Sequence, residues 1–378
     1  MERKLGFGCM HLPLTDPADA GSIDVAEFAR MADLFLARGF VYFDVASTYH
    51  DGQCEAALRR AVVERYPRTA FELTDKLPTL LLDDEQQQER TFALQLEACG
   101  VDFFDRYLVH CATRAFYEKA EALRSFEFVE RKKREGRIGL TGFSYHDSPE
   151  LLEEILARHP EIDFVQLQIS YVDWERTPIQ ARRCYETAHR HGKPVVAMCP
   201  QKNGMLSDVP AEVRQLFRAH RPDLAPAAWA MRFAASLDGV TTVLSGMSSL
   251  RQMEENTAFM RDFEPLDAEE RRIIEAATDA ICRTTPVQCT SCGYCLPTCP
   301  QRIPIADDLK LYNARTAFGQ TEATGPAQYA AFAKERGKAS ECVACGNCER
   351  ACPQHIRIVD WLKRVAEVFE GTPAPAGV

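Results

Sequence analysis

A cysteine motif that occurs twice constrains this chain more than any other feature of its sequence. The first copy, CTSCGYCLPTCP, covers residues 289–300, and the second, CVACGNCERACP, covers residues 342–353. Each copy reads C-x-x-C-x-x-C-x-x-x-C-P, so each offers three closely spaced thiols and a fourth that is set apart before a proline. The two segments are therefore expected to fold as one unit around shared metal chemistry.

The spacing within each copy is that of bacterial ferredoxins that hold two iron-sulfur clusters. Three neighbouring thiolates can hold one face of a cluster, whereas the displaced fourth thiolate reaches the other cluster. This crossed ligation predicts two ligand sets: Cys289, Cys292, Cys295 and Cys352 for one 4Fe-4S cluster, and Cys342, Cys345, Cys348 and Cys299 for the other. Zinc is the alternative, because paired C-x-x-C units also suit tetrahedral sites, and a disulfide framework is less favoured still.

The composition is that of a globular protein with room for more than one domain. The chain has 378 residues, of which 46% are hydrophobic, and its length alone suggests two or three domains. Its net charge of -10 and the lack of a basic patch disfavour nucleic-acid binding, and no apolar run reaches the roughly 18 residues that cross a bilayer. The apolar stretch near the start is too short for a secretory signal, and cluster-binding thiolates need a reducing environment. We therefore expect a cytoplasmic protein that binds neither nucleic acid nor membranes.

Strand-like and helix-like segments alternate through the first 280 residues. Short apolar runs predict eight strands, at residues 5–10, 40–45, 70–74, 106–110, 138–143, 164–169, 194–198 and 241–245. Helical patterns with capping signals lie between them, such as the helix that Asp24 opens and Gly39 ends. Continuous apolar strands separated by helices predict a parallel α/β sheet covered on both faces. Eight such units fit a closed (β/α)8 TIM barrel better than a doubly wound sheet, because no G-x-G-x-x-G follows any strand.

The predicted domains follow from these two patterns. Residues 1–280 are expected to form the barrel, residues 281–370 a small, mostly α-helical two-cluster ferredoxin-like domain, and residues 371–378 a disordered tail. Two segments between the cysteine motifs, residues 307–319 and 327–339, are predicted helices.

Four polar residues lie where successive predicted strands end. Asp44 ends the second strand, Tyr49 follows five residues later, Lys76 extends the third strand and His110 ends the fourth. Barrel enzymes carry their chemistry at the carboxyl ends of the strands, so these side chains are expected to face one mouth. A lysine cation favours the ionised form of a nearby tyrosine, and a carboxylate can hold that lysine. A histidine can orient a carbonyl or share the proton.

The same residues resemble a known family, the aldo-keto reductases. The resemblance rests on F-D-x-A-x-x-Y followed by Glu55, on Lys76 at a strand end, and on the segment from Asp105 to His110, and it covers roughly residues 5–260. With the cysteine motifs added, the whole chain is similar to the iron-sulfur branch of that family.

The resemblance implies a role for each mouth residue. Tyr49 would be the proton donor, Lys76 would tune it, Asp44 would pair with Lys76, and His110 would orient the substrate carbonyl.

Residues that would bind a nicotinamide cofactor match the family in part. Ser144 and Gln166 match residues that hold the carboxamide, and Glu255 with Asn256 matches the pair at the adenine end. Lys202, in the turn PQKNG, could cradle the pyrophosphate. Three positions depart from the family pattern: Tyr145, Met198 and Gln252. NAD(P) is therefore an expected cofactor, without support for a preference for NADP.

These features predict an oxidoreductase that acts on a small carbonyl or hydroxyl compound, sugar-like compounds included, with two 4Fe-4S clusters relaying electrons. A one-electron carrier protein is an expected partner. Nicotinamide moves two electrons together as hydride, a cluster moves one, and no flavin site that would convert between them is recognisable. Two alternatives stay open: an NAD(P)H-dependent carbonyl reductase whose clusters are purely structural, and an electron-transfer subunit without turnover of its own.

Overall fold

The computed structural model describes residues 3–17, 19–175, 179–318, 329–330, 332–333 and 336–371. The chain divides into two compact units, which we call the barrel unit and the cluster unit. The barrel unit comprises Met1–Ser170, Gln180–Pro200 and Ala228–Leu266. The cluster unit comprises Tyr171–Ile179, Gln201–Ala227 and Asp267–Val378.

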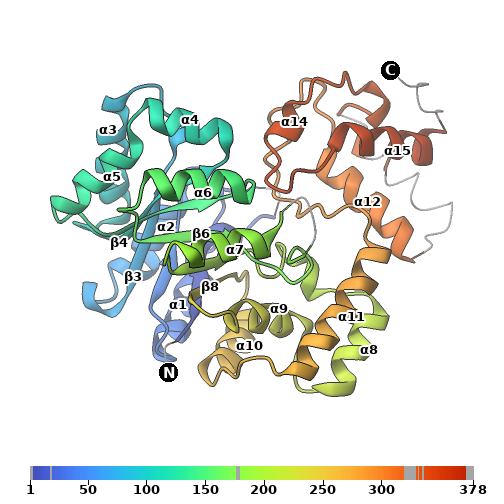
Figure 1. The fold of residues 1–378 in the computed structure, drawn as a ribbon, viewed down its shortest axis with the longest axis horizontal. Helices are drawn as coiled ribbons and strands as arrows, with labels where there is room; N and C mark the ends of the chain where they lie inside the picture. The colour runs from blue at the N-terminus through green and yellow to red at the C-terminus, as the bar shows by residue number, and fades with distance from the viewer. Residues whose placement is uncertain are drawn as a thin grey trace. The chain divides into compact units, whose positions relative to one another are not determined.

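Eight parallel strands within the described residues close a barrel in chain order, with β1 paired to β8 (Figure 1). Their bounds are β1 (Leu5–Gly8), β2 (Tyr42–Asp44), β3 (Glu72–Leu77), β4 (Phe104–Ala112), β5 (Ile138–Tyr145), β6 (Phe164–Gln168), β7 (Val195–Met198) and β8 (Val240–Gly246). Each coincides with one of the eight predicted strands. The predicted (β/α)8 fold is therefore confirmed, and the doubly wound alternative is wrong.

Helices cover the outside of the barrel, and the first of them begins after Asp24, as the sequence predicts. Those of the barrel unit are α1 (Val25–Ala37), α2 (Cys54–Leu58), α3 (Glu85–Cys99), α4 (Arg114–Ala122), α5 (Ser125–Arg134), α6 (Pro149–Arg158), α7 (Ala181–Arg190), α9 (Pro226–Ala235) and α10 (Leu250–Arg261). The Asp24 side chain accepts a hydrogen bond from the backbone N–H of Glu27 and so caps α1, as predicted. Gly100 ends α3 in the left-handed conformation, which a residue without Cβ adopts at little cost.

The barrel interior is filled by side chains that alternate along the strands. One buried cluster contains Tyr42, Leu108 and Phe164 from three different strands. Side chains two positions apart on a strand face the same side. Asp44, His110 and Gln166, each two residues further on, therefore face the interior at the carboxyl ends of their strands.

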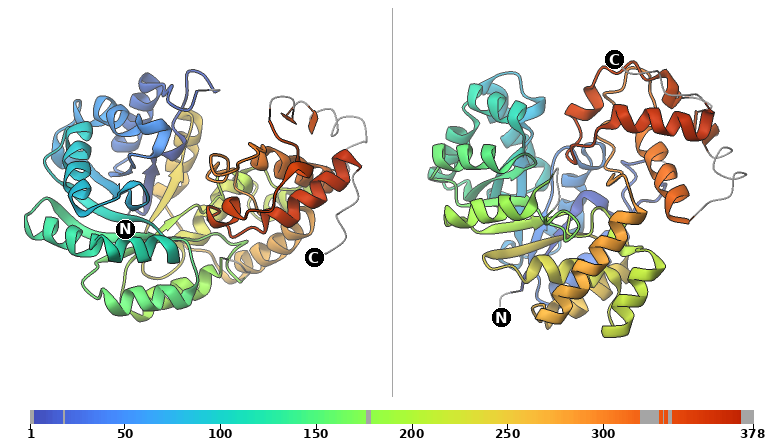
Figure 2. Two further views of the ribbon diagram at one scale, coloured as in Figure 1. Left: turned by 90° about the horizontal axis from the view of Figure 1, so that it is seen from above. Right: turned by 45° about the vertical axis from the view of Figure 1, so that its right-hand side comes forward.

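The cluster unit is helical and has its own core. Its helices are α8 (Ala211–His220), α11 (Ala268–Thr284), α12 (Ile305–Phe318), α14 (Asn347–Arg350) and α15 (Ile358–Glu370). Helices α12 and α15 pack side by side (Figure 2), and Ile305, Leu309, Leu362 and Val365 are buried in their shared core. Helix α12 confirms the first predicted helix between the cysteine motifs. The second, at residues 327–339, and the predicted tail at residues 371–378 lie largely outside the described residues.

The compact units divide the chain at points other than the predicted boundary at residue 280. Helices α8 and α11 pack together within the cluster unit, and two segments that follow β6 and β7 also belong to it. The boundary between a barrel domain and a cluster domain stays a prediction. Of the helices in the described ranges, none has the length and apolar character needed to span a bilayer.

Candidate active site and cluster ligands

Lys76 and Asp44 form a buried ion pair inside the barrel. Asp44 lies beside Thr74 in the register of β2 and β3, so Lys76, two residues later, faces the same side. The Lys76 Nζ atom lies 2.6 Å from Asp44 Oδ1 and donates a second hydrogen bond of 2.6 Å to the carbonyl of Val45. The two side chains are 1% and 3% exposed. Burial raises the pKa of Asp44, and the Lys76 ammonium opposes that rise.

Tyr49 and His110 lie next to this pair. Tyr49 begins a short 3-10 turn, η2 (Tyr49–Gly52), that follows β2. The Lys76 Nζ atom is 4.8 Å from the centre of the Tyr49 ring. The centres of the Tyr49 and His110 rings are 6.3 Å apart, and the two ring planes meet at 81°. The structure thus brings all four predicted mouth residues together, and their catalytic roles stay predictions.

The protonation states of the two rings are set mainly by burial. Burial raises the pKa of Tyr49 well above its usual value, and the nearby Asp44 carboxylate raises it further. The sequence predicts that Lys76 favours the ionised tyrosine, whereas in this structure burial, followed by Asp44, raises the pKa of Tyr49. Burial, followed by the charge of Lys76, holds the pKa of His110 well below its usual value. Tyr49 is therefore protonated and His110 is a neutral imidazole near pH 7, a combination that suits proton donation to a carbonyl oxygen.

A polar network behind β3 was missed by the sequence analysis. The Gln95 side chain donates hydrogen bonds to Glu55 Oε1 (3.2 Å) and to the Lys76 carbonyl (2.9 Å), and accepts one from the Tyr107 hydroxyl (2.5 Å). The Asp75 and Glu55 side chains hydrogen-bond to each other, and burial raises the pKa of both. The available signal was the placement of Asp75, a charged residue beside Lys76 in a strand that is otherwise buried.

Two of the predicted nicotinamide-binding residues share the barrel interior with the mouth residues. Ser144 and Gln166 are register neighbours in β5 and β6, and both are buried. The Gln166 Nε2 atom lies 3.5 Å from Asp44 Oδ2, whereas its buried Oε1 atom has no hydrogen-bond partner among the described residues. A buried acceptor of this kind fits a carboxamide N–H group of nicotinamide.

The other three predicted cofactor residues have protein partners. Asn256 donates a hydrogen bond of 3.1 Å to the Ser245 hydroxyl, and Glu255 pairs with Arg251 at 3.4 Å on the surface of α10. Lys202 belongs to the cluster unit and has a fully buried ammonium group. The predicted cofactor contacts of all three stay predictions.

The first predicted thiol set is gathered around one small cavity of the cluster unit. All four of its cysteines line that cavity: Cys289, Cys292, Cys295 and Cys352. Burial, together with the charges of the other three thiols, raises the pKa of Cys295 to about 12. A ligand that supplies positive charge is needed to hold such thiols as thiolates, as iron in a cluster would.

The second predicted thiol set is gathered in the same crossed manner. Cys299 of the first motif lies within electrostatic reach of both Cys342 and Cys348, and Cys345 lies within reach of Cys342. Eight thiols in two sets, each with three thiols from one motif and one from the other, fit two iron-sulfur clusters.

The two motifs also share a backbone conformation. Ser291 and Ala344, each two residues after the first cysteine of its motif, have φ values of 53°. The Ser291 N–H donates a hydrogen bond to Cys289 Sγ at 3.4 Å, and the Ala344 N–H does the same for Cys342. N–H donors aimed at sulfur stabilise a thiolate.

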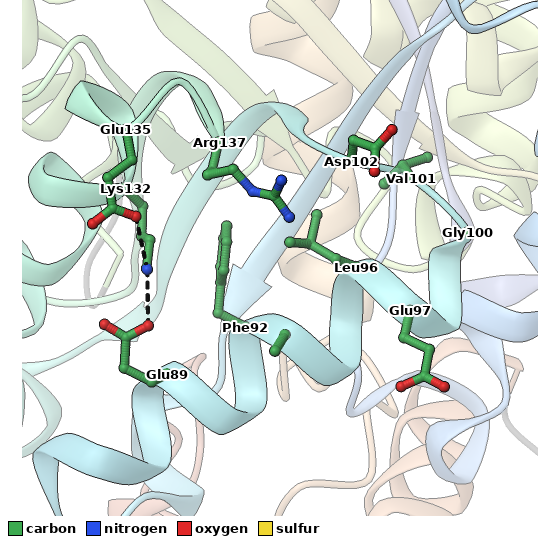
Figure 3. A pocket seen from close by; sticks show the side chains of 11 residues that line it. Glu89, Phe92, Leu96, Glu97, Gly100, Val101, Asp102, Lys132, Glu135 and Arg137 are labelled. Carbon is green, nitrogen blue, oxygen red and sulfur yellow. Dashed lines mark hydrogen bonds and ion pairs between the residues drawn. The ribbon is translucent and has the colours of Figure 1, made fainter.

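A hollow on the outside of the barrel unit, between α3 and α5, carries none of this chemistry (Figure 3). Lys132 bridges Glu89 and Glu135 there with two contacts of 2.8 Å. None of the mouth residues lines it.

The family comparisons agree with this geometry. A model of the aldo/keto reductase family matches residues 4–279, and a model of the 4Fe-4S dicluster domain matches residues 288–356. No curated protein matches the chain.

Several solved structures that are similar to this barrel are aldo-keto reductases. One, AKR11C1 from Bacillus halodurans in its holo form, is 24% identical over 72% of this chain and 91% of its own, with a TM-score of 0.59. Another, from Klebsiella pneumoniae in complex with NADPH, is 18% identical over 73% of this chain and 95% of its own, with a TM-score of 0.57. These likenesses show the fold, and the family match covers most of the chain. The chain therefore belongs to the aldo/keto reductase family of oxidoreductases and carries a C-terminal 4Fe-4S dicluster domain.

Proposed function

We propose that the barrel mouth interconverts a small carbonyl compound and its alcohol, sugar-like compounds included, and that two 4Fe-4S clusters relay electrons to or from that reaction. One observation carries the proposal: a single chain combines a buried acid–base group with two complete four-thiol sets. The acid–base group consists of Asp44, Tyr49, Lys76 and His110.

The mouth residues divide the proton chemistry among them. Tyr49 is protonated, so in the direction of reduction its hydroxyl donates a proton to the carbonyl oxygen. The tyrosinate left behind is stabilised by the Lys76 ammonium, which Asp44 holds in place. His110 is neutral and orients the carbonyl by a hydrogen bond.

The clusters and the nicotinamide would be two separate sources of electrons, and they differ in how many electrons they transfer at once. The eight cysteines would hold two clusters that exchange single electrons, and Ser144 with Gln166 would hold a nicotinamide that supplies hydride when bound. An alcohol and its carbonyl differ by two electrons and two protons. In the relay each of two clusters would supply one electron, Tyr49 would supply the proton for the oxygen, and water would supply the proton for the carbon. A one-electron carrier protein would then reload the clusters. Clusters of this kind need a reducing compartment, for which we propose the cytoplasm.

A second function is favoured by the unpartnered Oε1 atom of Gln166. This buried acceptor suits a nicotinamide carboxamide, and one structural relative was solved with NADPH. In that case the chain would be an ordinary NAD(P)H-dependent carbonyl reductase, and its clusters would only stabilise the fold.

A rapid-mixing experiment separates the two functions. Anaerobic protein is reduced with dithionite, freed of excess reductant and mixed with a panel of small aldehydes, ketones and aldoses without nicotinamide. Tyr49→Phe, which leaves the cysteines untouched, is the matched control. Cluster reoxidation that keeps pace with alcohol formation in the parent, and slows in the control, supports the relay.

Clusters that stay reduced while NAD(P)H alone drives full turnover refute the relay and support the ordinary reductase. Absence of turnover with either reductant, while the clusters still pass electrons to an external carrier, would instead favour an electron-transfer subunit.

A further inference from the structure

The turn after β7 that contains Lys202 and Asn203 forms hydrogen bonds with both chain segments that carry the first thiol set. The Asn203 side chain donates a hydrogen bond of 3.3 Å to the carbonyl of Thr290, which follows the first cysteine of the first motif. The Lys202 Nζ atom donates a hydrogen bond of 2.9 Å to the Gln354 side chain, two residues after the last cysteine of the second motif. One short turn thus contacts the two chain segments whose crossing creates this set.

Lys202 also brings a buried positive charge to the same place. Its side chain is 0% exposed, and its ammonium lies 2.8 Å and 2.7 Å from the two carboxylate oxygens of Asp173, which is 7% exposed. An ammonium group has three N–H donors, and these two contacts with the one to Gln354 use all three. Lys202 is therefore occupied within the cluster unit and offers no remaining donor to a phosphate in this structure.

The ammonium acts on the first thiol set through space. Lys202 contacts Gln354, two residues from Cys352, and the adjacent Asn203 contacts Thr290, next to Cys289, so the ammonium lies close to this set. The second set has a neighbour of opposite sign, because Glu349 directly follows Cys348 in the second motif. Charges near a cluster, together with hydrogen bonds and solvent exposure, set its reduction potential.

We propose that Lys202 and Asp173 form a positioning pair that sets the reduction potential of the first cluster, held by Cys289, Cys292, Cys295 and Cys352, and that Lys202 does not bind a nucleotide. Reduction adds one negative charge to a cluster, so a buried cation favours the reduced form and Asp173 limits that effect. The first cluster is then the more readily reduced of the two. This inference rests on the two-cluster arrangement of the proposed function.

The test is a redox titration of the anaerobic, cluster-loaded protein at pH 8, followed by electron paramagnetic resonance. Lys202→Met should make the first cluster harder to reduce by about tenfold, which is about 59 mV for a one-electron couple. Asp173→Asn should shift the same cluster in the opposite direction. Lys310→Met, which removes an exposed lysine of α12, should leave both potentials unchanged.

Two further preparations make the titration decisive. Cys299→Ser removes a ligand of the second set, so the signal that survives in it identifies the first cluster. Lys202→Arg keeps the positive charge and should retain most of the parent potential. Iron should stay at about eight atoms per chain in the Lys202 and Asp173 variants, as two four-iron clusters require.

Unchanged potentials in Lys202→Met, together with weaker binding of NADPH measured by fluorescence, would overturn the inference and assign Lys202 to the cofactor. Shifts of the same sign in Lys202→Met and Asp173→Asn would also overturn it, because they would reflect a disturbed fold rather than charge. Failure of the proposed relay is a separate result. In that case the potentials shift as expected while reduced clusters leave carbonyl compounds untouched.

Discussion

Replacing Lys76 by methionine tests whether the mouth depends on its buried ion pair. The change keeps an apolar stem of similar length but leaves the Asp44 side chain, 3% exposed, without its cation. Breaking a buried pair by removing one partner costs about 3–5 kcal/mol, whereas a solvent-exposed pair is worth about 0–1 kcal/mol. Lys133→Met is a matched control, because Lys133 lies 2.5 Å from Asp163 but the two side chains are 28% and 26% exposed. We expect the first variant to lose several times more stability than the second.

The burial of Asp44 determines whether that loss of stability grows or shrinks as the pH rises. Burial already raises the pKa of Asp44, and Lys76→Met removes the group that opposes the rise. A carboxyl with a higher pKa in the folded than in the unfolded state binds its proton more tightly when folded. The contribution of Asp44 to the stability of Lys76→Met should therefore be most favourable below the ordinary aspartate pKa of about 3.9 and fall as the pH rises through the raised value. Adding Asp44→Asn removes the unpaired charge and should recover most of the loss.

Urea unfolding of the cluster-loaded variants between pH 5 and pH 8 measures these differences. The midpoint of Lys76→Met should fall further below that of the parent as the pH rises, and the double variant should lack this trend. A loss no larger than that of Lys133→Met, or one that does not change with pH, would refute the reasoning.

Three other predictions concern the acid–base group and the clusters. Tyr49→Phe should lower turnover by roughly 10²–10⁴ while iron content and circular dichroism stay at parent values, since one general acid is lost; parent-like turnover would exclude Tyr49 as the proton donor. Because burial holds the pKa of His110 well below its usual value, carbonyl reduction should show no loss between pH 8 and pH 6, and a decline centred near pH 6.5 would show that His110 becomes charged there. Cys299→Ser should damage the cluster held by Cys342, Cys345 and Cys348, and Cys352→Ser should damage the other cluster. If electron paramagnetic resonance spectra show that each variant damages only the cluster of its own motif, the crossed ligation is wrong.

The barrel and its mouth could be predicted because both depend on short periodicities. Each apolar run coincides with a strand, and residues two apart on a strand share a face, so Asp44 and Lys76 had to meet once β2 and β3 paired. The crossed thiol sets depend on spacing alone in the same way.

Contacts between distant segments could not be predicted. Lys202 lies 29 residues from Asp173 and 152 residues from Gln354 along the chain, and no local sequence pattern links them. The protonation of Tyr49 was also beyond the sequence, because a charge can be read from residue types but the degree of burial cannot. Burial raises the pKa of that tyrosine well above its usual value.

The network behind β3 explains how Lys76 can carry a positive charge in so dry a place. Lys76 faces the interior and Asp75 the opposite side, where Asp75 and Glu55 hydrogen-bond to each other. That hydrogen bond requires one of the two carboxyls to be protonated, so the pair contributes one negative charge rather than two. With Asp44 on the inner face, Lys76 is then flanked by a carboxylate on each side of the strand. Gln95 joins the outer pair to the Lys76 carbonyl, so the strand that presents the cation to Tyr49 is also held by helix α3.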